Sequence, residues 1–77
     1  MKAVKFEDLK VGQTYAVVFS PGQRTEEYFK AKIESVNSLV AVGIIDRRII
    51  LLASKNEIKK GQEIFLHKNK NHFYECN

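Results

Sequence analysis

The sequence predicts an all-β protein: a small antiparallel barrel of five or six strands, of the split or SH3-like kind, with one short helical turn. Two apolar runs rich in Val, Ile and Leu, 39–45 and 49–53, are too short for helices of this composition and carry no polar face. Segments before and after them alternate apolar and polar residues with the period of two that a half-buried strand requires. Turn residues separate these segments, as expected in an antiparallel β-protein.

Size and composition predict one domain, residues 1–77. A chain of 77 residues supports a single core, and 44% hydrophobic with 29% charged residues is ordinary globular composition. The longest apolar run has seven residues, too few for a membrane helix, and the first residues lack the apolar core of a signal peptide. The single cysteine, Cys76, has no partner for an internal disulfide. We therefore expect a cytoplasmic protein with no membrane insertion.

The N-terminal part predicts a plug, a strand and a turn. Residues 6–10, which end just before Gly12, predict either one helical turn or a loop closed by that glycine, and we expect Phe6 and Leu9 to fill one end of the barrel. The first strand follows over 14–19. Residues 20–23, with the sequence Ser-Pro-Gly-Gln, predict a type II turn, because proline suits its second position and glycine accepts the positive φ of its third.

A second strand is predicted over 27–36. Alternation would point Phe29, Ala31 and Ile33 inward. Val36 breaks this alternation unless the strand contains a bulge near Ser35.

The two apolar runs, 39–45 and 49–53, predict the central hairpin. Asp46, Arg47 and Arg48 then form its tight connection and place two guanidinium groups at an exposed tip. Such groups suit phosphates or an acidic partner, although charge in a solvated turn also has the simple role of keeping the protein soluble.

The C-terminal part predicts a helical turn and two more strands. Residues 54–57 have capping-box spacing, which favours a short helical turn before Gly61. Residues 63–67 predict a strand and 72–75 a short closing strand, with a polar turn between them. Gly12 and Gly61 stand in similar contexts before a strand, so we expect positive φ at both.

Several of these features, taken in order, resemble the PilZN-like split barrel that forms the N-terminal domain of bacterial flagellar brake proteins. The features are Leu-Lys-Val-Gly-Gln at 9–13, the strands 28–36 and 39–45, the glycine turn and strand at 58–66, and Phe73-Tyr74. The resemblance implies a module that contacts a partner. It implies no nucleotide site, because the Arg-x-x-x-Arg and Asp/Asn-x-Ser-x-x-Gly patterns of cyclic di-GMP-binding PilZ domains do not occur in the sequence.

The central hairpin is apolar on both faces, whereas a simple barrel strand is apolar on one. Either the N-terminal segment and the 55–60 turn cover the second face, or a protein partner or a second copy does. If these side chains stayed exposed to water, the protein would lose several kcal/mol of stability, at about 25 cal/mol per Å² of apolar surface. The sequence therefore predicts a non-catalytic binding or regulatory module, a dimer or a partner of another protein. Its predicted contact residues are Val40, Val42, Ile44, Arg47, Arg48, Ile50 and Leu52.

A basic C-terminal region supports a second hypothesis, a small nucleic-acid-binding barrel. The formal net charge is +4, and lysines interleave with aromatic residues, as in barrels that hold single strands. A basic edge that discourages sheet-to-sheet aggregation would look similar. The residues of this alternative are Lys55, Lys59, Lys60, Phe65, His67, Lys68, Lys70 and Tyr74.

No pattern in the sequence predicts catalysis, a metal or a cofactor. His67, His72 and Cys76 match no zinc spacing and lack a fourth ligand. Glu26 and Glu27 are adjacent in a predicted strand and would face opposite sides, so they cannot act together as acid and base. There is no phosphate-binding glycine loop and no evident small-molecule substrate. We expect that the chain is not an enzyme.

Overall fold

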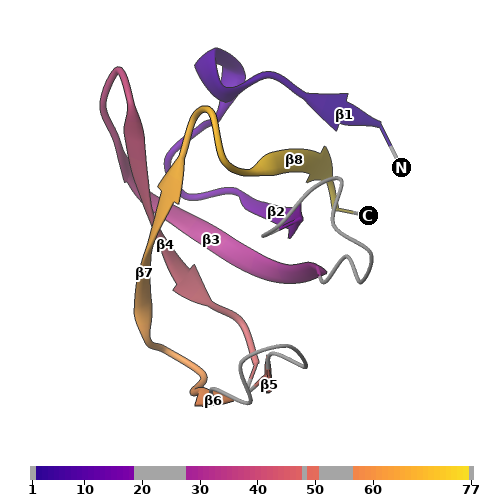
Figure 1. Cartoon of the computed structure of the whole chain (residues 1–77), viewed down its shortest axis with the longest axis vertical. Helices are drawn as coiled ribbons and strands as arrows, with labels where there is room; N and C mark the ends of the chain where they lie inside the picture. Colours follow the sequence, from indigo (N-terminus) through magenta and orange to yellow (C-terminus); the bar gives the residue numbers. More distant parts are fainter. Residues whose placement is uncertain (1, 19–27, 48, 51–56, 77) are drawn as a thin grey trace.

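The computed structural model describes residues 2–18, 28–47, 49–50 and 57–76, with only the backbone described for 49–50. Six strands form one antiparallel sheet in the order β1-β8-β2-β3-β4-β7, and this sheet curls around a core (Figure 1). The strands are β1 Ala3–Val4, β2 Thr14–Val18, β3 Tyr28–Val36, β4 Val40–Ile45, β7 Glu63–His67 and β8 His72–Glu75. Two further strands, β5 Ile49–Ile50 and β6 Glu57–Ile58, pair with each other. The predicted small, all-β, barrel-like fold is confirmed.

The core forms because one face of each long strand is apolar at every second residue. In β3 the buried positions are Phe29, Ala31 and Ile33, as the sequence predicts. Their neighbours in the core include Val17, Ile45 and Leu66, each exposed by 1% or less.

A 3-10 turn, Phe6–Asp8, closes one end of this core. Phe6 and Leu9 are both buried, and the Phe6 ring packs on the ring of Phe73 with 5.9 Å between centroids and a tilt of 58°. This aromatic geometry is a favourable one, so the predicted plug is confirmed.

Local irregularities also follow the sequence. The register of β3 against β4 shifts between Ile33 and Ser35, which is the predicted bulge. Gly12 and Gly61 have φ of 90° and 85°, so both glycines occupy the left-handed conformation that other residues rarely adopt.

The predicted hairpin between 39–45 and 49–53 is wrong. Strand β4 lies between β3 and β7, so both of its edges are already occupied, and β5 pairs with β6 instead. The apolar composition of both runs correctly indicated strands. It could not indicate pairing, because β4 pairs with the preceding strand, β3, and with the distant strand β7 rather than with the next strand along the chain.

The helical turn predicted before Gly61 is wrong where the structure describes it, because Glu57 begins strand β6. The rest of that turn, 54–56, lies outside the described residues, as do Phe19 and the turn predicted at 20–23.

Candidate protein-interaction surface

The outer surface of β4 and β7 carries an apolar strip that the core does not use. Val40, Val42 and Ile44 alternate with buried residues along β4 and are half-buried. Phe65, on β7, lies directly opposite Val42 and is 68% exposed. Val40 and Ile44 lie opposite His67 and Glu63. We call these six residues, Val40, Val42, Ile44, Glu63, Phe65 and His67, the β4–β7 face.

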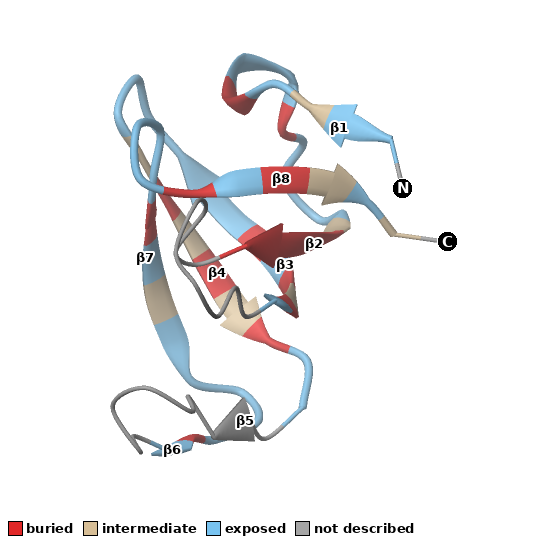
Figure 2. Cartoon of the chain, turned by 45° about the vertical axis from the view of Figure 1, so that its right-hand side comes forward, coloured by how far each residue is buried: buried red, intermediate tan, exposed pale blue. Residues whose placement is uncertain are grey.

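This face is more exposed to solvent than the corresponding side of β2. Strand β2 is buried on both sides, since Ala16 and Val18 are 2% and 8% exposed, close to the values of Tyr15 and Val17 on its other side (Figure 2). Strand β4 is fully buried only on its inner side, where Ala41 is 0% exposed. The outer side of β4 and β7 therefore has apolar side chains available for contact, in addition to Tyr28 and Val36 on β3.

Strand β7 is also an edge strand, and its free edge is short. Residues Leu39 and Lys68, and likewise Ile45 and Gln62, are linked by main-chain hydrogen bonds across β4 and β7. This phase directs the main-chain groups of Ile64 and Leu66 toward β4. Those of Glu63 and Phe65 point away from β4, where the described part of the chain supplies no strand (Figure 1).

The free edge ends at His67. Its N–H donates to the side-chain oxygen Oδ1 of Asn71 at 2.8 Å, and its carbonyl accepts from the N–H groups of Lys70 and Asn71. These bonds satisfy the main chain at the start of the β7–β8 turn. Among the described residues, the main-chain groups of β7 that point to the free edge without a partner strand are therefore those of Glu63 and Phe65.

Two carboxyl groups lie close together at the border between the β4–β7 face and β3. Glu34, at the bulge of β3, lies close to Glu63 of β7. The nearby negative charge of Glu63 raises the pKa of Glu34, with a smaller contribution from desolvation. The Glu63 side chain thus reaches across β4 toward β3, away from the free edge of β7.

The lysines of the nucleic-acid hypothesis do not form one patch. Lys59 and Lys60 precede β7, whereas Lys68 and Lys70 follow it, so the pairs lie at opposite ends of the strand. Lys68 makes an ion pair with Glu7, with 2.7 Å between Nζ and Oε1.

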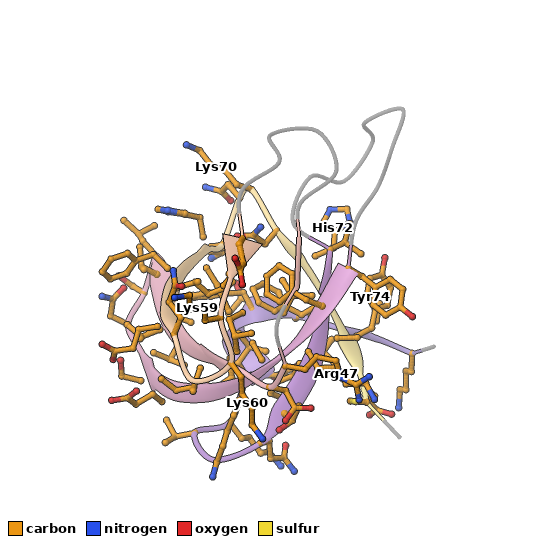
Figure 3. All side chains as sticks on the ribbon, turned by 90° about the horizontal axis from the view of Figure 1, so that it is seen from below. Arg47, Lys59, Lys60, Lys70, His72 and Tyr74 are labelled. Carbon is orange, nitrogen blue, oxygen red and sulfur yellow. The ribbon has the colours of Figure 1, made fainter. Side chains whose placement is uncertain are left out.

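The remaining residues of that hypothesis divide in the same way. Phe65 and His67 belong to the β4–β7 face, but Tyr74 lies on β8 between Ala3 and Ala16. Viewed from below, Lys59 and Lys60 lie on one side of the molecule, and His72 and Tyr74 on the other (Figure 3). Lys55 lies outside the described residues.

The residues of the protein-partner hypothesis are partly brought together. Val40, Val42 and Ile44 share one face, and Arg47 is exposed just beyond the end of β4. Ile50 belongs to the separate β5–β6 pair, and Arg48 and Leu52 lie outside the described residues. Sequence reasoning did not place Phe65 beside Val42, because that contact depends on pairing between distant strands, although the alternation in β7 does direct Phe65 outward.

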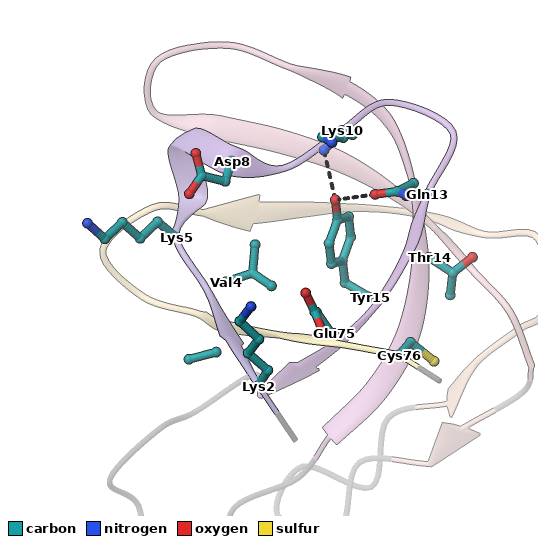
Figure 4. Close-up of a pocket in the computed structure, with 11 residues that line it drawn as sticks. Lys2, Val4, Lys5, Asp8, Lys10, Gln13, Thr14, Tyr15, Glu75 and Cys76 are labelled. Atoms are coloured by element: carbon teal, nitrogen blue, oxygen red, sulfur yellow. Dashed lines mark hydrogen bonds between the residues drawn. The ribbon is translucent and has the colours of Figure 1, made fainter.

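A cleft of about 650 Å³ lies elsewhere, between the N-terminal segment, β2 and β8. Lys2, Lys5 and Lys10 line it together with Asp8 and Glu75 (Figure 4).

Tyr15 lines this cleft, and its hydroxyl already has two hydrogen-bond partners. The hydroxyl of Tyr15 accepts a hydrogen bond from the main-chain N–H of Lys10 and donates one to Oε1 of Gln13, each 2.9 Å long (Figure 4). These bonds fix the Tyr15 ring and join the N-terminal segment to β2. We assign this tyrosine a structural role.

No cluster of three or more His, Cys, Asp or Glu residues suited to a metal occurs within the described ranges. Across the same ranges, every buried side-chain nitrogen and oxygen has a hydrogen-bond partner. A helix long and apolar enough to cross a membrane is likewise not found in this part of the chain.

No family model, curated protein or solved structure matches the chain. The resemblance to PilZN-like domains therefore stays a prediction, and the candidate site rests on its geometry.

Proposed function

We propose that the chain is a cytoplasmic, non-catalytic module that binds a protein partner through the β4–β7 face. The observation that carries this proposal is the Val42–Phe65 pair, in which an aromatic ring on edge strand β7 is 68% exposed beside a half-buried valine of β4. Burying a phenylalanine side chain fully is worth about 1.5–3 kcal/mol, which a monomer leaves unused and a complex recovers. Exposed aromatic anchors within an apolar strip are typical of protein interfaces.

The charges of this face favour a protein over a nucleic acid. Glu34 and Glu63 lie beside the apolar strip, where a polyanion would have to bring phosphates close to carboxyl groups. The lysines that would contact a backbone stand at the two ends of β7 rather than along it. A protein partner can place apolar side chains over the centre and leave the carboxyl groups at the rim.

The proposal is tested by photo-crosslinking in the cells that produce the chain. The photoreactive residue p-benzoylphenylalanine replaces Phe65 in one variant and Val11 in the other. These positions are 68% and 65% exposed, and Val11 lies in the turn before β2, away from the β4–β7 face. We expect a discrete adduct from position 65 that is absent from position 11, with the partner identified by mass spectrometry.

A second substitution links the adduct to the face. Val42→Lys should abolish the adduct formed from position 65, because a charge would replace the apolar neighbour of the ring. Equal adducts from positions 65 and 11, or none from position 65, would contradict the proposed function.

A further inference from the structure

We infer that the partner is an extended segment of another protein, apolar at its centre and acidic at both ends, which adds to β7 as a further strand of the sheet. This inference rests on the proposed function and specifies its partner. Edge-strand addition supplies affinity through main-chain hydrogen bonds and specificity through alternate side chains.

The main chain of β7 can pair with one more strand over residues 63–65, which we call the β7 window. The N–H and C=O groups of Glu63 and Phe65 point to the free edge, while those of His67 are occupied at the β7–β8 turn. A partner strand in register would form four main-chain hydrogen bonds with these two residues, accepting two from their N–H groups and donating two to their carbonyl groups. An added strand is short and in contact with few residues, so side chains must also contribute to binding.

The side chains around the window leave it accessible. Edge strands are commonly protected by a charged residue, by proline or by a covering segment. Glu63 is the charged residue of this window, and its carboxyl group lies close to that of Glu34, across β4 from the free edge. Phe65 stands at the edge and extends the apolar surface of Val42 toward an incoming strand.

The lysines at the two ends of β7 define the charge of the partner. Lys59 and Lys60 are exposed before the strand, and Lys70 is exposed after it. The five residues of β7 span about 17 Å, so a partner with acidic residues on both sides of a five-residue apolar centre matches this arrangement. We therefore expect a partner segment in which acidic residues flank an apolar centre on both sides.

The same lysines disfavour a second copy of this chain. Antiparallel pairing of two β7 strands would bring the end with Lys59 and Lys60 of one copy beside the end with Lys70 of the other. Each chain also carries a formal net charge of +4. Like charges opposed across a contact suppress association.

The inference is tested first by peptide selection. A displayed library of random 12-residue peptides is selected on the full chain and counter-selected on the Phe65→Lys variant. We expect a consensus of alternating apolar residues with Asp or Glu at both ends. The double variant Lys59→Gln/Lys60→Gln should weaken the synthetic consensus peptide at least fivefold, whereas Lys5→Gln/Lys10→Gln, in the distant cleft, should change its affinity less than twofold.

Amide hydrogen exchange then identifies the mode of binding. On saturation with the consensus peptide, exchange at Glu63 and Phe65 should slow at least tenfold, because these N–H groups gain partners. A consensus without acidic ends, failure to select any peptide, or protection at other amides would overturn the inference. So would a photo-adduct at position 65 that proves to be a second copy of the chain or a nucleic acid. A photo-adduct with another protein whose binding leaves these two amides unprotected would overturn it as well, while the proposed function would stand.

Discussion

Val42 and Phe65 are direct cross-strand partners on the outer side of β4 and β7, and they come from segments that the sequence keeps 23 positions apart. Their backbone neighbours Ala41 and Leu66, paired with each other, are both 0% exposed in the core. One pair of strands therefore supplies core packing on one side and an accessible apolar surface on the other. A partner can therefore contact the outer side without disturbing the core.

Adjacent lysine substitutions in β4 should separate surface from core. Val42→Lys should lower the free energy of unfolding by about 1 kcal/mol, because a lysine stem can lie along the surface with its charge in water. Ala41→Lys should cost more than about 4 kcal/mol, because it buries an unpaired charge. Denaturant titration measures both variants, and equal losses would mean that the outer side of β4 is part of the core.

Gly43 is a packing position in which a side chain has no room. A Cβ added there would lie 2.9 Å from Cδ1 of Leu66 and 3.1 Å from Cβ of Ala31. Gly43→Ala should destabilise the protein by about 1–3 kcal/mol through overpacking. In the double variant with Leu66→Ala the combined loss should be smaller than the sum of the single losses, since the alanine removes one obstructing group. Strict additivity would show that Leu66 is not the obstruction.

The Glu7–Lys68 ion pair should stabilise the protein above acidic pH. The hydrogen bond and charge of Lys68 lower the pKa of Glu7, with a further contribution from a backbone hydrogen bond. The unfolded state therefore binds a proton more readily, and stability from this group is lost as pH falls below the usual glutamate pKa of 4.5 through the lower folded value. Thermal melts between pH 2 and 7 should show a shallower acid decline for Glu7→Gln, and the same for Lys68→Met. A decline as steep as in the wild type would contradict the pairing.

Glu34 should behave in the opposite sense in the same experiment. Its pKa is raised by the charge of Glu63, so the folded state holds this proton more tightly than the unfolded state. Its stabilising effect is present below pH 4.5 and is lost as pH rises through the higher folded value. Glu34→Gln should therefore raise the melting temperature at pH 7 relative to the wild type and have a smaller effect at pH 4. An equal effect at both pH values would contradict the proximity of the two carboxyl groups.

Local sequence patterns predicted most of the strands and turns of the fold. The alternation in 63–67 and 72–75 predicted strands β7 and β8 at their observed bounds, and Val36 out of phase predicted the bulge in β3. Gly12 and Gly61 were identified as turn residues, since the need for positive φ is itself local. Each of these inferences uses residues that are neighbours in the sequence.

The pairing of β4 was not predictable in this way. Residues 49–53 looked as suitable a partner for 39–45 as residues 63–67, since apolar composition does not encode which strand pairs with which. The candidate site depends on that choice. Phe65 meets Val42, and Glu63 reaches Glu34, only because β7 lies beside β4.

The central claim is that a partner covers Phe65 in the cell, and hydroxyl-radical footprinting tests it most directly. Tyr28 is the matched control, because it is 64% exposed and lies on β3 beyond the end of β4, while Phe65 is 68% exposed. The modification of each residue in cells is divided by its modification in the purified chain. The account predicts that this ratio falls at least threefold lower for Phe65 than for Tyr28. Equal ratios at the two residues would show that no partner occupies the β4–β7 face and would contradict the account.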